Sequence, residues 1–174
     1  LLQRREVAKI AVVHITPDRG LCGGLNSNMN RLTANFMLEQ NVPVSLITIG
    51  RKGRDFMMRS GSYLRAEFAH LGDKPSLLDT FPISQIIIDD YSTGVIDLVY
   101  LAYAQFVSTT LQKPVLQQLL PVEPASIPAV QNVDYIYEPD PAAVLNELLP
   151  RFVEMQVYHA ILESIASEQS ARMV

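Results

Sequence analysis

The sequence predicts an α/β fold: a mixed but mainly parallel sheet with helices on both faces, plus a projecting C-terminal helix. Three observations predict it. The apolar run from Val7 to Ile15 is interrupted only by Lys9 and His14, which is typical of a strand covered on both faces. Segments of strand and helix periodicity then alternate, which indicates a sheet with helices packed on it. The chain closes with a long amphipathic pattern over residues 144–174.

Composition limits the class of protein. The chain has 174 residues, of which 48% are apolar and 18% charged, as in an ordinary globular domain. Its net charge of −4 argues against a nucleic-acid surface. No apolar run approaches the roughly 20 residues that span a bilayer, so direct membrane insertion is not expected. The basic cluster Arg51, Lys52 and Arg54, with Arg59 nearby, is interpreted as the solvated face of a helix.

The remaining elements follow from periodicity and breakers. Helices are expected over Leu25–Gln40, Lys52–Ser60 and Ser76–Ser92, and strands over Val42–Ile49, Tyr63–Phe68, Asp97–Val107, Val115–Leu120 and Val133–Tyr137. The Tyr63–Phe68 strand is expected at an edge. The tight connection before Val115 is placed at Gln112–Pro114. Pro82 removes a backbone donor, so a break or kink is expected near Phe81.

The last helix is the clearest element. Asp140 suits the N-cap and Pro141 the first helical position. Apolar residues recur close to the 3.6 period at Leu145, Leu148, Leu149, Phe152, Met155, Tyr158, Ile161, Leu162 and Ile165. A helix over residues 144–174 would be about 45 Å long, so its far end is expected to project. A helix folded back onto the domain is the alternative. Pro150 should kink it near Asn146.

A glycine-containing loop follows the first strand. Residues Asp18 to Asn26 lead from that strand into a helix, which is where nucleotide-binding α/β folds hold a phosphate. The glycine spacing fits neither G-x-G-x-x-G nor G-x-x-x-x-G-K-[ST]. Two interpretations stay open here: a phosphate- or nucleotide-binding enzyme site, or tight turns that Gly20, Gly23 and Gly24 permit.

Cys22, the only cysteine, is the one candidate nucleophile in this loop. A helix N-terminus can activate a thiol, and His14, in the strand before the loop, is the nearest candidate base. A small packed side chain is the simpler interpretation. The sequence offers no self-consistent catalytic set and no cluster with metal-ligand spacing. We therefore expect no catalytic, cofactor-binding or metal-binding residues, and no cofactor.

Three segments resemble the gamma subunits of F-type ATP synthases. Residues 16–28, TPDRGLCGGLNSN, resemble that family's DRGLCGGLN segment. Residues 162–174, LESIASEQSARMV, resemble the start of its C-terminal signature, and residues 134–141, DYIYEPDP, match a third stretch. The three occur in the family's order and extend over most of the chain.

The resemblance implies a non-catalytic rotor subunit rather than an enzyme. Residues 1–139 would be the Rossmann-like domain at the foot of the central stalk, and residues 140–174 the start of the C-terminal coiled-coil helix. Such a subunit passes torque between the membrane c-ring and the catalytic alpha/beta hexamer during proton-driven ATP synthesis. It is a peripheral membrane protein at the cytoplasmic face of the bacterial plasma membrane, or at the equivalent organellar face. Both ends of this chain are then expected to be cuts.

The resemblance also assigns partners and residues. The implied partners are the epsilon subunit, the c-ring and the alpha and beta subunits, with no nucleic acid. Tyr135, Tyr137 and Glu138 fall in the stretch expected to contact the c-ring and epsilon side. The family-signature loop, read as a structural fingerprint, comprises Asp18, Arg19, Gly20, Cys22, Gly23, Gly24 and Asn26. Pro150 departs from a straight stalk helix, and a single cysteine leaves no dithiol switch of the chloroplast kind.

Overall fold

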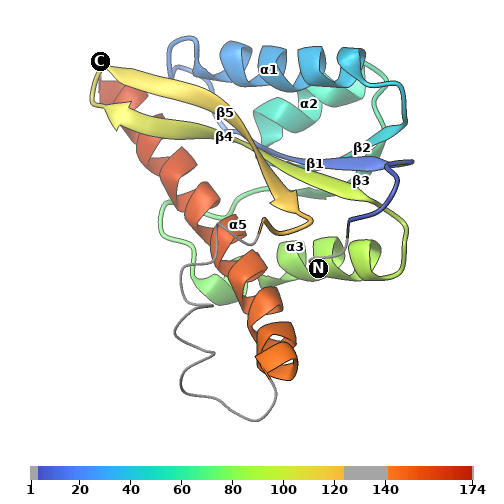
Figure 1. Cartoon of the computed structure of the whole chain (residues 1–174). Coiled ribbons are helices and arrows are strands. Elements are labelled where there is room, and N and C mark those ends of the chain that lie inside the picture. Colours follow the sequence, from blue (N-terminus) through green and yellow to red (C-terminus); the bar gives the residue numbers. More distant parts are fainter. Residues whose placement is uncertain (1–3, 124–140, 174) are drawn as a thin grey trace.

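A five-stranded sheet lies between two layers of helices in the computed structural model, which describes residues 4–123 and 141–173 (Figure 1). The strand order is β3-β2-β1-β4-β5. The strands are β1 (Ile10–Ile15), β2 (Val44–Ile49), β3 (Leu64–Phe68), β4 (Leu98–Ser108) and β5 (Leu111–Leu120). The helices are α1 (Leu25–Glu39), α2 (Arg51–Arg59), α3 (Leu77–Ser92) and α5 (Pro141–Met173).

Strand β1 is the centre of the sheet. It pairs in parallel with β2 on one side and β4 on the other, and all six of its residues are buried. Ile10 and Val12 belong to the core under α1 and α2, whereas Val13 and Ile15 belong to the core under α3 and α5. Burying each such side chain contributes about 1.5–3 kcal/mol. A continuous apolar run is therefore what two-sided burial requires.

The predicted fold class is confirmed. Helices α1 and α2 cover one face of the sheet and α3 and α5 the other (Figure 1). Strand β3 lies at an edge, as predicted, and pairs in parallel with β2. Strand β5 forms the other edge and is the one antiparallel member of this sheet. The sheet is thus mixed and mainly parallel.

One local prediction was wrong, and at a second site the predicted break is not seen. The reversal between β4 and β5 falls at Thr109 and Thr110, not at Gln112–Pro114, and Pro114 lies within β5 opposite Ala104. An edge strand tolerates proline because one of its sides needs no ladder hydrogen bond. Helix α3 is not broken at Pro82, which lies on its exposed face, where water can reach the carbonyl left without a donor.

Helix α5 runs as a single element through Pro150. From Leu149 onward it lies against β4 and α3, and its far end at Met173 stays beside the β4–β5 hairpin (Figure 1). Its beginning, where Asn146 and Glu147 are exposed, extends beyond the sheet. The C-terminal helix projects at its first turns only. The prediction that its far end projects is wrong: that half of the helix is folded back onto the domain, as in the alternative.

The buried stripe of α5 differs from the predicted one. Met155 is partly exposed, and the buried residues are Leu149, Val153, Val157, Ala160, Ile161, Ser164, Ser167 and Ser170. The predicted stripe omitted the three serines because they are polar, but their hydroxyls bond to the sheet, as described below. The predicted N-cap Asp140 and the predicted strand Val133–Tyr137 lie outside the described residues.

Gly53 allows α2 to lie close to β1. A Cβ at this position would come within 2.6 Å of the His14 ring and 2.8 Å of the Thr16 hydroxyl oxygen. We expect Gly53→Ala to destabilise the protein by about 1–3 kcal/mol, as overpacking of a core does. Gly20→Ala is the control, because its Cβ would meet only the flexible Lys52 side chain at 3.8 Å. Urea unfolding of both variants tests this, and equal stabilities would contradict the close approach.

Candidate functional site

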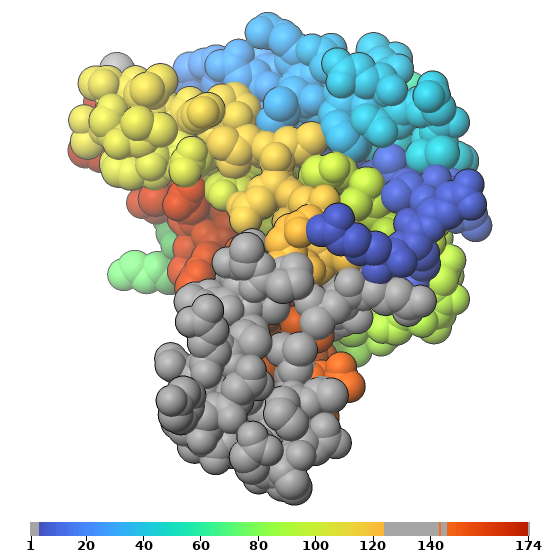
Figure 2. Space-filling model, viewed as in Figure 1, coloured from blue at the N-terminus to red at the C-terminus, as the bar shows by residue number. Residues whose placement is uncertain are grey.

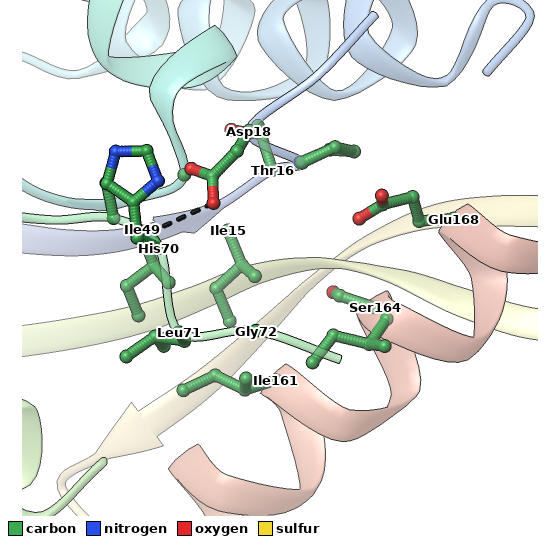
Figure 3. Close-up of a pocket in the computed structure, with 14 residues that line it drawn as sticks. Ile15, Thr16, Asp18, Ile49, His70, Leu71, Gly72, Ile161, Ser164 and Glu168 are labelled. Carbon is green, nitrogen blue, oxygen red and sulfur yellow. Dashed lines mark hydrogen bonds between the residues drawn. The ribbon is translucent and has the colours of Figure 1, made fainter. Parts of the chain in front are cut away.

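The loop after β1 caps helix α2. The carboxylate of Asp18 accepts the backbone N–H of Arg51 at 2.9 Å through Oδ1. It also accepts the backbone N–H of His70 at 3.0 Å through Oδ2 (Figure 3). Pro17 accepts the N–H of Lys52 through its carbonyl oxygen at 3.2 Å. Helix N-termini attract anions because their first N–H groups have no partner within the helix. Here the chain's own carboxylate occupies that position.

Thr16 completes the cap. Its hydroxyl oxygen accepts the N–H of Gly53 at 2.8 Å, and its own N–H donates to Ile49 at 2.8 Å. All three first-turn N–H groups of α2 are therefore bonded to residues 16–18. The loop holds the ends of β1 and β2 and the start of α2 together through hydrogen bonds within the chain.

The glycine half of the loop forms a tight corner before α1. Gly23 has a φ of 65° and Leu21 one of 62°, and the Leu21 side chain is 96% exposed. Cys22 points inward and is buried, with Sγ 3.9 Å from the carbonyl oxygen of Arg19. Gly24 is the N-cap of α1. The glycines of this corner therefore permit tight turns of the backbone, which is the second of the two interpretations of the loop.

The last helix contacts this loop through one side chain. The guanidinium of Arg172 donates to the carbonyl oxygens of Gly20 at 2.7 Å and Arg19 at 3.2 Å. Glu168, one turn earlier, holds the same guanidinium through an Nε–Oε2 bond of 3.0 Å. Asn26 also donates to Arg19, at 3.4 Å. Two of the three recognised segments, distant in sequence, thus meet in the fold.

A row of serines fixes α5 to β4. Ser164 accepts the backbone N–H of Ala104 at 3.2 Å, and Ser167 donates to the carbonyl oxygen of the same residue at 3.0 Å. Ser170 donates to the carbonyl of Thr109 at 2.8 Å. Pairing between β1 and β4 ends at Ala102, two residues before Ala104. The hydroxyls of Ser164 and Ser167 therefore bond to backbone groups of β4 beyond the last residue that pairs with β1.

The crevice at the carboxyl ends of β1, β2 and β3 is small. This is where open α/β sheets hold their ligands, but the cavity measures about 50 Å³, against about 300–1,000 Å³ for typical ligand pockets. Ile161, Ser164 and Glu168 of α5 line it from one side (Figure 3). An open hollow of about 560 Å³ adjoins it and is lined by charges of both signs, including Arg51 and Asp73. Nothing in this geometry favours a nucleotide or phosphate.

The structure does not pair Cys22 with His14. The His14 ring is fully buried in α1's packing surface, with Nε2 2.8 Å from Asn30 Oδ1 and Nδ1 2.8 Å from the Thr33 hydroxyl. Burial lowers the pKa of His14 from its usual value near 6.5 to about 4, and burial raises the pKa of the Cys22 thiol. A thiol held protonated beside no base is not an activated nucleophile. The enzyme interpretation of this loop depended on a pairing of Cys22 with His14, and the structure does not contain that pairing.

The predicted residues separate into two groups. Asp18, Arg19, Gly20, Cys22 and Asn26 join with Arg172 in one corner of the fold, together with Gly23 and Gly24. The predicted partner contacts Tyr135, Tyr137 and Glu138 lie outside the described residues. Within residues 4–123 and 141–173, no group of three acidic, His or Cys side chains could hold a metal ion. No helix of that part is long and apolar enough to cross a bilayer.

The sequence contained a signal for the missed contacts. Ser164, Ser167 and Ser170 recur every three residues along one side of a helix, next to buried Ala160 and Ile161. Residues three apart in a helix share a face, so small polar residues in series predict a close approach to backbone. Arg172 gave no such signal, because its acceptors lie in a distant loop.

Comparisons with known proteins agree over the full chain. A family model described as "ATP synthase" matches residues 1–174. The ATP synthase gamma chain of Dehalococcoides mccartyi (strain ATCC BAA-2266 / KCTC 15142 / 195) is 66% identical over 174 residues, 100% of this chain and 61% of that protein. That of Roseiflexus sp. (strain RS-1) is 49% identical, with the same coverage of 100% and 61%. This chain therefore spans about 61% of the length of these relatives.

Solved structures share the fold. The Tetrahymena thermophila mitochondrial ATP synthase, central stalk and c-ring, contains a chain with a TM-score of 0.71 at 24% identity, covering 98% of this chain and 76% of that one. The Euglena gracilis mitochondrial ATP synthase rotor gives a TM-score of 0.67 at 18% identity, covering 97% and 64%. At these identities the likeness establishes the architecture.

Arg172→Ala should open the corner and expose Cys22. The largest influence on the pKa of Cys22 is burial, which raises it, while the Arg172 charge lowers it. Removing that charge alone would leave less thiolate and slow labelling by a thiol reagent. We expect the opposite result, labelling that is at least about tenfold faster, because the loop opens more often without Arg172 and exposes the thiol. Arg151→Ala, at an exposed position of the same helix, is the control. Slower labelling of Arg172→Ala than of the unchanged chain would show that Arg172 does not hold the loop closed.

His14 should make stability depend on pH in a defined window. Its folded pKa, about 4, lies below the unfolded value near 6.5, so the unfolded chain binds the extra proton between these values. Stability is complete above pH 6.5 and falls as the pH drops toward 4. Between pH 7 and pH 5 the loss should be about 2 kcal/mol. Urea unfolding of the chain and of His14→Gln measures it; an equal pH dependence in both proteins would refute this assignment.

Proposed function

Because the chain belongs to the gamma-chain family of ATP synthases, we propose that it is the part of a gamma chain that mounts the central rotor stalk. In this role the α/β layers are a rigid base, and α5 is the start of the C-terminal stalk helix over residues 140–174. The base transmits torque between a membrane ring and a catalytic hexamer. It carries out no reaction itself.

One observation carries the mechanical part of this proposal. The far half of α5 is fixed at successive turns, by Ser164 and Ser167 to Ala104 and by Ser170 to Thr109. Arg172 adds a charge-assisted link to the carbonyls of the first loop. Directional bonds at successive turns resist both sliding and rotation of the helix about its axis, which apolar packing alone resists poorly. A helix held in this way can transmit a twisting load to the sheet.

Partners follow from the same premise. We propose contacts with the epsilon subunit, the c-ring and the alpha and beta subunits, and a peripheral place at the cytoplasmic face of a bacterial membrane or its organellar equivalent. The resembled Tetrahymena structure is of a central stalk with its c-ring, which supports this arrangement. Tyr135, Tyr137 and Glu138 remain our proposed contacts on the ring and epsilon side, since tyrosine offers rigid amphipathic area at interfaces.

A chimeric gamma chain tests the proposal. The matching segment of the Dehalococcoides mccartyi gamma chain would be replaced by this chain, and the assembled enzyme placed in vesicles. We expect ATP synthesis driven by an imposed proton gradient at a rate close to that of the parent. Purified chain titrated calorimetrically with ATP, ADP and phosphate should show no saturable binding. An assembled chimera without coupled synthesis, or nucleotide binding abolished by Gly23→Val, would overturn the proposal.

Loosening the mount should uncouple the enzyme. In the same chimera, Ser164→Val with Ser167→Val leaves both backbone groups of Ala104 without partners, at a cost of about 1–3 kcal/mol each. We expect ATP synthesis to fall several-fold while ATP hydrolysis is retained. Ser60→Val with Ser92→Val changes two exposed serines and should leave synthesis unchanged. Equal synthesis by both double variants would show that the serine row does not transmit torque.

A further inference from the structure

Helices α1 and α2 border a groove on the face of the sheet opposite α5. It measures about 510 Å³ and is lined by residues of both helices. Arg31 of α1 and Lys52 and Arg59 of α2 contribute its charges, with Asn35 and Phe56 among its other walls. No acidic residue lines it. The groove is therefore a local positive site on a chain whose net charge is −4.

The basic cluster at Arg51, Lys52, Arg54 and Arg59, predicted to form one solvated helix face, is divided in the structure. Arg54 turns away to pair with Asp55 at 3.1 Å and, at 4.0 Å, with Glu67. Arg51 lines the hollow near the first loop. Lys52 and Arg59 remain, and both line the groove. The cluster is thus not a uniform helix face.

The three groove cations are exposed. Within the described part of the chain, neither Arg31, Lys52 nor Arg59 forms an ion pair. Arg65, by contrast, pairs with Asp90 at 3.0 Å. Unpaired cations that converge on one hollow give a local potential that favours an anionic partner.

The spacing of the cations indicates the shape of that partner. Lys52 and Arg59 are seven residues apart on α2, two helical turns or about 10.5 Å. Arg31 faces them from α1 across the groove. A rod carrying carboxylates on one side at intervals of three, four and seven residues matches this arrangement, because those positions share a helix face.

We propose that the groove between α1 and α2 docks an acidic α-helical segment of a protein partner. A membrane surface fits less well, because a plane cannot follow charges set around a concave groove. A free phosphate fits less well, because the groove is formed by the sides of two helices rather than by a cradle of backbone N–H groups. The inference stands on the groove and its charge alone and does not depend on the rotor role.

Fluorescence anisotropy with a designed probe tests the proposal. The probe is a labelled, alanine-based helical peptide of about 16 residues with glutamates at i, i+3, i+7 and i+10, and its control has glutamine at those positions. We expect saturable binding of the glutamate peptide, weakened by raising NaCl from 50 to 300 mM. Arg31→Gln, Lys52→Gln and Arg59→Gln combined should weaken binding at least about tenfold.

Matched controls separate a groove from general attraction. Lys74→Gln, Lys113→Gln and Arg151→Gln combined remove the same charge from exposed positions elsewhere and should leave binding within about twofold. Arg31→Glu, Lys52→Glu and Arg59→Glu combined should instead bind the same peptide with lysines in place of the glutamates. Circular dichroism and urea unfolding verify that each variant is folded.

Three outcomes would overturn the proposal. One is absence of binding by the glutamate peptide, and another is equal weakening by both glutamine triples. The third is binding to vesicles containing 30% phosphatidylserine that the groove triple abolishes, while the peptide does not bind; that result would assign the groove to a membrane. None of these results bears on the chimera experiment above, so the groove and the rotor role can fail separately.

Discussion

Strand β4 extends beyond the end of its parallel pairing with β1, and the rest of the structure is arranged around that difference in length. Pairing with β1 ends at Ala102, yet β4 continues to Ser108. Buried backbone groups left without partners cost about as much as a lost hydrogen bond. Helix α5 supplies what the sheet lacks, because Ser164 and Ser167 bond to both backbone groups of Ala104. The position of the last helix on the sheet is therefore set by hydrogen bonds, not only by apolar contact.

The positions at which nucleotide-binding α/β folds hold a ligand are occupied in part by this chain's own side chains. In such folds the space beyond the carboxyl ends of the strands is left open, and a helix N-terminus faces it. Here Asp18 fills the anion position at α2, and side chains of α5 such as Ile161 reduce the crevice to about 50 Å³. Arg172 then closes the corner from the far helix. The architecture is kept, and the space for a ligand is used for internal contacts.

Periodicity predicted most of the fold because each element reports its own burial locally. The unbroken apolar run of β1 follows directly from helices on both faces. The errors arose where a partner distant in the chain decides the outcome. Ser167 is polar but fully buried, and its hydroxyl donates to the carbonyl oxygen of Ala104. Local periodicity could not predict this, because the acceptor is 63 residues away in the sequence. Pro82 and Pro150 are tolerated because exposure or packing compensates for a lost local bond. In the first loop, the glycines alone indicated tight turns. The cap formed by Asp18 could not be predicted in the same way, because it depends on where α2 lies in the fold.

The two faces of the sheet are free to serve different purposes. Helices α3 and α5 bury one face, and α5 is held there by directional bonds. Helices α1 and α2 cover the other face and border a groove lined by Arg31, Lys52 and Arg59, which form no ion pair within the described residues. A partner that docks in the groove contacts side chains on the outside of these helices, so it need not disturb Ser164 or Arg172. Strand β1 is buried along its whole length and contributes side chains to both cores, so it is the element that links the two helix layers directly.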